Sequence, residues 1–265
     1  MYRANIALRR TLIFVILVNI HRLPLAQSAP IQDLALIHSK IYPSPTDSAI
    51  ADGTILMRNG LILAVGSSKD IQIPPKTRII DCKGMVVTAG FWNSHVHLLL
   101  PGLLHQEKVS SEQLTSQLNE MLTRWGFTTV FDIASELNNT NSIRDRITRG
   151  SVTGPRILTT GEPFWVKGGT PFYVRDFLLE NNIHIPEVIS LDEAENRVDS
   201  QIRNAADGIK IFINSLERDT ILNMPLPMVK GISSRAHMFG KPVFAHVSTQ
   251  MGIETALQGG VDIIA

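Results

Sequence analysis

Short, nearly continuous apolar runs alternate with amphipathic stretches over most of the chain after residue 84. This pattern predicts strands at residues 85–97, 128–133, 156–160, 209–214, 243–246 and 261–265. Helices are expected between them, at residues 111–125, 142–148, 191–206, 228–239 and 252–257. Strands and helices that alternate in this way form right-handed βαβ units around a parallel sheet.

Six such strands fit either an open doubly wound sheet or the first part of a closed eight-stranded barrel. No Gly-x-Gly-x-x-Gly motif follows the first strand, so a dinucleotide-binding fold loses its main support. In a barrel, functional groups gather at the carboxyl ends of the strands. The polar and ionisable residues of this chain fall at those ends.

The segment before this region has a different rhythm, with short strands and turns from residue 34 to residue 82. Asn59 and Gly60 separate two apolar runs, which predicts a hairpin because both turn residues need positive φ. We therefore expect a small all-β module over residues 29–84, too small to bury much of a core by itself.

Residues 1–28 have the layout of a secretory signal peptide. Arg9 and Arg10 precede an apolar run at residues 12–18, and a small-x-small cleavage signature follows at residues 26–28. The run is too short to span a bilayer. We expect an exported protein, periplasmic or secreted, with no membrane association after cleavage. An uncleaved anchor is the alternative, and the choice between general and twin-arginine export stays open.

Composition narrows the class of protein further. The 265 residues are 44% hydrophobic and 18% charged with a net charge of +1, which gives no basic excess for binding nucleic acid. Cys82 is the one cysteine, so an internal disulfide and a cysteine-based metal site are both excluded. A small-molecule partner is expected, and self-association is left open.

Two histidines end the first strand of the alternating region. His95 and His97 are one residue apart, so both imidazoles point to the same face of the strand. Paired neutral imidazoles make half of a metal site, although two ordinary strand histidines are the simpler interpretation.

The fourth and fifth strands carry two further candidates. Lys210 lies on the opposite face from three isoleucines, those at positions 209, 211 and 213. If the isoleucines face the helices, Lys210 points inward, where its amine must be neutralised, paired or modified. An exposed edge strand would leave Lys210 in water. His246 ends the fifth strand.

Together these residues resemble the amidohydrolase superfamily, most closely its imidazolonepropionase-like and Xaa-Pro dipeptidase-like branch. The likeness rests on Val-Thr-Ala-Gly-Phe at residues 87–91 before His95 and His97, on Lys210, on His246 and on the preceding β module. It runs from about residue 31 to the end. It implies an α/β fold: an incomplete (β/α)8 TIM barrel over residues 85–265, behind a composite β-sandwich module.

The resemblance also implies a chemistry. His95 and His97 would hold a first metal, His246 would hold a second, and Lys210, carboxylated by CO2, would bridge them. Two zinc ions are expected, with manganese, iron or cobalt as alternatives. The implied reaction is hydrolysis of an amide, cyclic amide or dipeptide C–N bond by a metal-activated hydroxide.

Two groups of the family pattern fall beyond residue 265: a strand-six histidine and the proton-accepting aspartate of strand eight. We therefore expect a C-terminally truncated chain that contains no catalytic residue of its own. An inactive remnant and a mononuclear, deaminase-like hydrolase are the alternatives. Asn93 departs from the pattern, because many relatives carry an aspartate two positions before the first histidine.

Three weaker candidates complete the set. Asp132 ends the second strand and could orient a ligand histidine from behind, although a turn or helix-cap role is favoured. Trp165 and Tyr173 belong to a glycine-containing aromatic loop at residues 161–173. This loop is either a substrate lid or a packed surface loop.

Overall fold

The computed structural model describes residues 33–217 and 220–265, so the predicted signal peptide at residues 1–28 lies outside it. The described residues divide into two compact units, one that ends at Ala89 and one from Gly90 to Ala265. Within the described ranges, no helix combines the length and the apolar character needed to cross a membrane.

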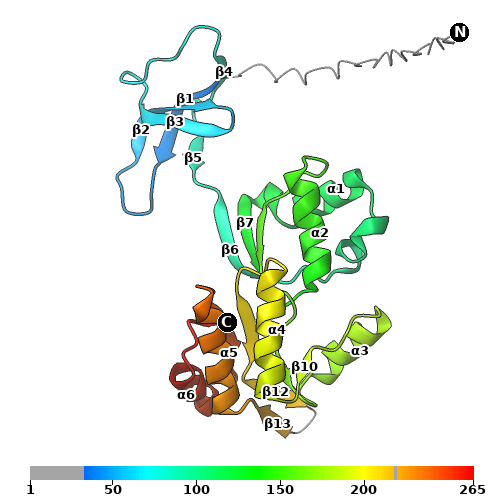
Figure 1. Cartoon of the computed structure of the whole chain (residues 1–265). Helices are drawn as coiled ribbons and strands as arrows, with labels where there is room; N and C mark the ends of the chain where they lie inside the picture. The colour runs from blue at the N-terminus through cyan, green and yellow to red at the C-terminus, as the bar shows by residue number, and fades with distance from the viewer. Residues whose placement is uncertain (1–32, 218–219) are drawn as a thin grey trace, which may run out of the picture. The chain divides into compact units, whose positions relative to one another are not determined.

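The first unit is one five-stranded sheet (Figure 1). Its strands are β1 (Asp33–Tyr42), β2 (Ile50–Arg58), β3 (Leu61–Ser67), β4 (Arg78–Asp81) and β5 (Val86–Thr88). β2 pairs antiparallel with β1 and β3, whereas β4 and β5 pair parallel with β1. The hairpin predicted at Asn59 and Gly60 is present, with φ values of 51° and 77°.

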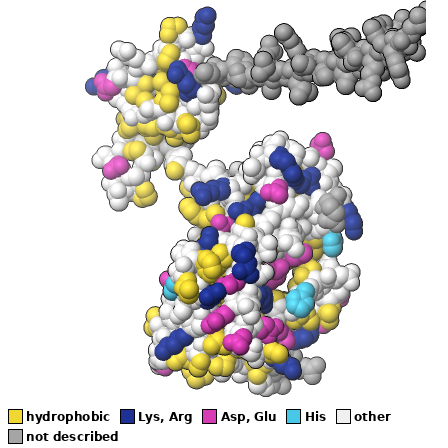
Figure 2. All heavy atoms as spheres, in the orientation of Figure 1, with side chains coloured by type: hydrophobic (Ala, Val, Ile, Leu, Met, Phe, Trp, Pro, Cys, Tyr) yellow, Lys and Arg dark blue, Asp and Glu magenta, His cyan; other side chains and the backbone are white. Residues whose placement is uncertain are grey.

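Apolar side chains remain exposed on this first sheet, as the visible face in Figure 2 shows. They include Leu61, Ile62, Leu63 and Ile79. The described residues of the unit form a single layer, so the composite sandwich implied by the resemblance is not confirmed.

The second unit is built on parallel strands in chain order. One ladder is β6 (Phe91–Val96), β7 (Phe127–Asp132) and β8 (Arg156–Thr159), and the other is β11 (Ile209–Phe212), β14 (Val243–His246) and β15 (Ile263–Ile264). The Asp207 N–H donates to the Thr159 carbonyl at 2.6 Å, next to the start of β11. The described strands do not close into a barrel.

Helices and short elements complete the second unit. The helices are α1 (Ser111–Met121), α2 (Leu137–Thr148), α3 (Phe172–Glu180), α4 (Leu191–Arg203), α5 (Leu226–Met238) and α6 (Gln250–Gln258). Short strand pairs are β9 (Trp165–Val166) with β10 (Glu187–Val188), and β12 (Asn214–Glu217) with β13 (Thr220–Asn223). Single 3-10 turns lie at Pro101–Leu103, Gln106–Lys108 and Thr123–Trp125. Helix α3 and both short pairs were not predicted.

Two apolar cores hold the helices on the strands. The first joins β11 and β14 to α4, α5 and α6 through residues such as Ile211, Val198 and Ile232. The second joins β7 and β8 to α1 and α2, with Val130 and Leu118 fully buried. Lateral apolar contacts of this kind leave the strand ends available for polar groups.

The single strand predicted at residues 85–97 is wrong in one respect, because it is two strands with different partners. β5 pairs with β1 in the first unit, and β6 pairs with β7 in the second. An apolar run does not reveal which strand will accept its hydrogen bonds. Gly90 begins the second unit where a Cβ atom would lie 2.0 Å from the Thr128 hydroxyl, so the backbone there approaches β7 too closely for a side chain.

Helix α4 begins with a side-chain cap at Ser190. The Ser190 hydroxyl accepts from the Glu193 N–H at 3.2 Å, while the Glu193 carboxylate accepts from the Ile189 N–H at 2.9 Å. The reciprocal bond therefore reaches one residue further back than a simple capping box. The carboxylates of Asp192 and Glu193 in the first turn also interact favourably with the helix dipole.

Replacing the cap tests its contribution. Ser190→Ala is expected to lower the free energy of unfolding by about 1 kcal/mol, because it leaves a first-turn N–H without its acceptor. Ser200→Ala, at an exposed position of the same helix, should change stability by only a few tenths of that. Urea denaturation measures both, and equal losses would contradict the capping role.

Candidate functional site

The paired histidines stand at the carboxyl end of β6. His95 lies within the strand and His97 directly follows it, and their ring centroids are 5.2 Å apart at 86°. Asn93 accepts from the His95 backbone N–H at 3.1 Å, so this departure from the family pattern has a local backbone role. Both rings are open to solvent on one side.

Lys210 projects inward from β11, as predicted. Ile209 and Ile211 pack into the helix-facing core, and Lys210 on the other face is 1% exposed. Its Nζ donates to the carbonyl of Ala265 at 2.9 Å and lies 5.3 Å from the ring centre of Phe212. An amine at such a position is largely removed from water.

His246 ends β14, beside β11 in the parallel ladder. Its ring stacks on Phe212 at 4.8 Å and 28°, and its Nε2 lies 3.0 Å from the hydroxyl of Ser248. Phe212 also packs 4.8 Å from Trp165. Phe212 therefore restrains His246 on one side while it forms an apolar wall with Trp165.

These groups line one pocket of about 310 Å³. Its lining comprises His95, His97, Leu99, Ala134, Trp165, Pro171, Tyr173, Val174, Lys210, Phe212 and His246. Six of the seven side chains singled out from the sequence therefore meet there, and the seventh, Asp132, does not line it.

The environment of the pocket favours uncharged nitrogens. Burial lowers the pKa of His97 to about 4, with smaller contributions from the charges of His95 and Lys210. Burial also lowers the pKa of Lys210 to about 8. The pKa of His95 and that of His246 are lowered as well, first by burial and then by the Lys210 charge.

A nitrogen must be unprotonated to bind a metal ion, and the pocket shifts all four groups toward that form. Within residues 33–217 and 220–265, however, no three side chains of His, Cys, Asp or Glu are grouped closely enough to hold a metal by themselves. A complete set of ligands would need donors of another kind.

Comparisons with known proteins give a partial sequence match and a match in fold. No protein-family model matches the chain. The dihydroorotase of Aquifex aeolicus (strain VF5) is 30% identical over 121 residues, which cover 44% of this chain and 26% of that enzyme.

Solved structures match over much more of the chain. A Xaa-Pro dipeptidase with bound methionine in its active site has a TM-score of 0.71 at 23% identity, over 88% of this chain and 61% of that one. An amidohydrolase has a TM-score of 0.71 at 21% identity, over 88% and 60%. The chain has the fold of the amidohydrolase-type enzymes. It spans about 60% of the length of these neighbours.

In this amidohydrolase-type fold, Asp132 lies behind the histidine pair. Its carboxylate is fully buried and accepts from the Leu98 N–H at 3.3 Å. It also accepts three hydroxyl donors, those of Ser135 at 2.5 Å, Thr140 at 2.8 Å and Thr159 at 3.4 Å. Burial raises the pKa of Asp132 to about 6, and these hydrogen bonds limit the rise. None of the four bonds goes to a histidine, and the N-cap of α2 is Glu136.

Asn214 has a comparable place behind His246, and the sequence reasoning assigned it no role. It is 1% exposed, and its carbonyl oxygen accepts from the N–H groups of Ser248 and Thr249 at 2.9 and 3.3 Å. Its position two residues after Phe212 and four after Lys210 places all three on one face, so the period of two contained the signal.

The loop with Trp165 and Tyr173 is held in place. Glu187 accepts from the N–H groups of Gly168 and Thr170 at 2.9 and 3.2 Å and pairs with Arg175 of α3. Trp165 is 4% exposed, whereas Tyr173 lies at the open side of the pocket. These bonds favour the packed-loop alternative over a freely moving lid.

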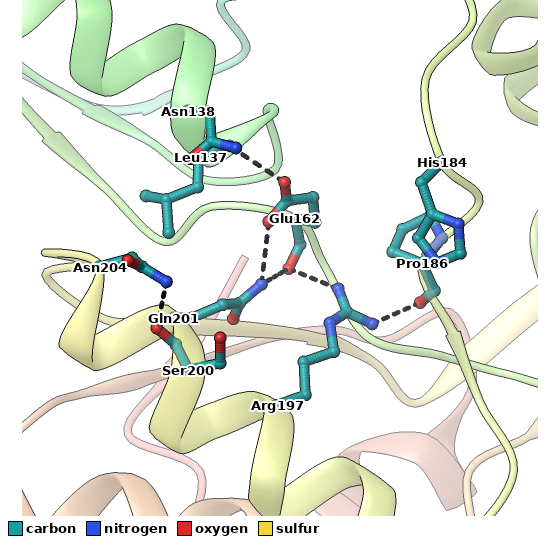
Figure 3. Close-up of a pocket in the computed structure, with 9 residues that line it drawn as sticks. All are labelled: Leu137, Asn138, Glu162, His184, Pro186, Arg197, Ser200, Gln201 and Asn204. Carbon is teal, nitrogen blue, oxygen red and sulfur yellow. Dashed lines mark hydrogen bonds between the residues drawn. The ribbon is translucent and has the colours of Figure 1, made fainter.

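A second hollow, of about 280 Å³, lies between α2, α4 and the segment around His184 (Figure 3). Its charged side chains form hydrogen bonds with backbone groups. Arg197 donates to the carbonyls of Glu162, Pro163 and Pro186 at 2.8 to 3.1 Å, and the Glu162 carboxylate accepts from Leu137 N–H and Gln201. The arrangement joins α4 to the neighbouring loops rather than presenting free charges.

The influence of Lys210 on the histidines can be measured. Lys210→Met removes a positive charge, so the pKa of His97, His95 and His246 should rise toward the ordinary value, most clearly where burial contributes least. Titration of the ring nitrogens by 15N NMR provides the measurement. Lys230→Met, at an exposed position of α5, should leave the three pKa values unchanged. A further fall in Lys210→Met would contradict the assignment.

Proposed function

We propose that the protein is a metal-dependent hydrolase acting on an amide-type C–N bond. The observation that carries this proposal is the convergence on one pocket of three histidines at the carboxyl ends of parallel strands, His95, His97 and His246, with Lys210 from within β11. The amidohydrolase-type fold supports it, since its neighbours include a Xaa-Pro dipeptidase and an amidohydrolase.

The donor chemistry of the pocket fits divalent cations. His95 and His97 would hold one ion and His246 a second, because three imidazoles in an environment that disfavours protonation are good ligands for zinc. Manganese, iron and cobalt ions can also bind imidazole, so the histidines alone do not decide between these metals and zinc. When bound, such ions activate water and polarise the carbonyl of the scissile bond.

Lys210 would supply the oxygen donors that the histidines lack. Its neutral amine can add to CO2, which forms one N–C bond, releases one proton and yields a carbamate anion. A pKa of about 8 leaves about one amine in ten neutral at pH 7, against about one in three thousand at an ordinary lysine. The anion would offset the charge of two cations, so the buried lysine becomes compatible with them.

The wall of the pocket favours an apolar group beside the scissile bond. Trp165, Phe212, Pro171 and Val174 provide it, and the described lining contains no arginine or carboxylate to pair with a charged substituent. A hydrophobic wall of this kind typically discriminates by 10- to 200-fold per methylene group. We therefore propose small N-acyl or dipeptide-type amides with an apolar side chain as substrates.

Export of the protein is part of the proposal. It rests on the basic, apolar and small-residue segments of residues 1–28, which lie outside the described ranges. N-terminal sequencing of the secreted or periplasmic product would test it, with a start near residue 29 expected and an intact Met1 contradicting cleavage.

Zinc binding tests the core of the proposal. The chain is expected to bind zinc, and His95→Ala combined with His97→Ala should weaken the affinity at least about a hundredfold, because two ligands are removed. Competition with a chromophoric chelator gives the affinity. His184→Ala changes a histidine of the second hollow and should bind as the parent does. A parent protein without affinity for zinc, manganese, iron or cobalt would refute the metal site.

Carboxylation of Lys210 has its own readout. With metal and 13C-labelled bicarbonate present, a carbamate resonance is expected in the 13C NMR spectrum of the parent protein. Lys210→Ala should lose it, and Lys230→Ala should keep it. A parent spectrum without this resonance would favour a mononuclear site that uses the histidines alone.

A further inference from the structure

Two buried acceptors lie directly behind the pocket histidines, one for each side of the site. We propose that Asp132 and Asn214 are positioning residues that fix the chain just after His97 and just after His246. This inference rests on the proposed function for its meaning, but its geometry is independent of any bound ion.

The first of these acceptors extends the ladder between β6 and β7. The last backbone bond of that ladder runs from the Ile133 N–H to the Val96 carbonyl at 3.0 Å. Beyond it the strands offer no further partner, and the Leu98 N–H instead reaches the Asp132 carboxylate and the Ser135 hydroxyl, at 3.3 and 2.8 Å. His97 is therefore held on both sides, at Val96 and at Leu98.

The second acceptor repeats the construction between β11 and β14. The Ile213 N–H donates to the His246 carbonyl at 3.0 Å, and the N–H groups of Ser248 and Thr249 donate to the Asn214 side chain. Because the Ser248 hydroxyl contacts the His246 ring, fixing the Ser248 backbone also fixes that contact.

Close packing around Asn214 leaves little freedom for this arrangement. A Cβ atom on Gly252 of α6 would lie 1.9 Å from the Asn214 carbonyl oxygen. The side-chain amide also donates to Asn223 at 2.6 Å. The helix therefore approaches the amide as closely as glycine allows, and the amide cannot turn without losing its bonds to Ser248, Thr249 and Asn223.

Asp132 is unusual because a buried carboxylate normally needs a cation. Here four donors match its lone pairs, so the ionised form is satisfied without a counter-ion. The donors come from the segment after β6, from the β7–α2 loop, from α2 and from β8. A purely structural hydrogen-bond cluster would contribute to stability alone, whereas a positioning residue must also affect metal affinity.

The experiment compares Asp132→Asn, Asp132→Ala and Asn214→Ala with Gln201→Ala. Gln201 is a matched control because its buried side-chain amide does not line the pocket. The amide donates to the Glu162 carbonyl at 2.7 Å. Three quantities are measured on the whole chain: zinc affinity, hydrogen exchange of the Leu98 and Ser248 amides, and the thermal midpoint.

We expect Asp132→Ala and Asn214→Ala to weaken zinc binding about tenfold or more, the usual effect of losing a partner that orients a ligand. Asp132→Asn, which keeps one acceptor oxygen, should fall between them and the parent. Leu98 exchange should accelerate only in the Asp132 variants, and Ser248 exchange only in Asn214→Ala. The control should lose stability at unchanged zinc affinity.

Three results would overturn the proposal: parental zinc affinity in Asp132→Asn and both alanine variants, an affinity loss in Gln201→Ala equal to theirs, or unchanged exchange at Leu98 and Ser248. If an alanine variant does not fold, Asp132→Asn and the exchange of Leu98 decide the question. A parent protein that binds no metal would refute the proposed function instead, and the exchange rates would still test the positioning.

Discussion

The burial of the Lys210 amine is the constraint on which the second unit depends. An ammonium group in this position gives up most of its hydration, and one carbonyl bond and the face of one aromatic ring replace only part of it. The fold tolerates this cost because β11 pairs with β14 in a parallel ladder whose helix-facing side is well packed. Buried ionisable groups with strongly shifted pKa values cluster at functional sites.

The same burial organises the electrostatics around it. Three imidazoles share the pocket with the amine, and each loses proton affinity through a combination of desolvation and like charge. A metal cation that bound here would find imidazole nitrogens that are largely unprotonated, with lone pairs free for coordination. An anion formed at the lysine would reverse the sign of the local field, so the apo pocket and a modified, ion-filled pocket differ electrostatically far more than they need differ in shape.

Sequence reasoning identified the pocket because parallel strands have a simple geometry. A period of two places His95 with His97 and turns Lys210 away from its flanking isoleucines, and the carboxyl ends of parallel strands meet at one edge, which brings in His246. It did not separate β5 from β6, because hydrogen-bond partners are set by tertiary structure. Nor did it find β9, β10 or α3, whose arrangement depends on the single carboxylate of Glu187. The period of two placed Asn214 on the same face as Lys210, but its role depends on bonds to Ser248 and Thr249, which are distant in the sequence.

Phe212 has a consequence of its own for how such a site could change over time. One ring touches the histidine of β14, faces the amine of β11 and forms the apolar wall with Trp165. A substitution that reshapes the wall for a different substrate therefore disturbs the ligand and the amine at once. Under the proposed function, selectivity and ion affinity would be coupled through this residue, and changes of specificity would be expected first at Val174 or Tyr173, which line the pocket from α3.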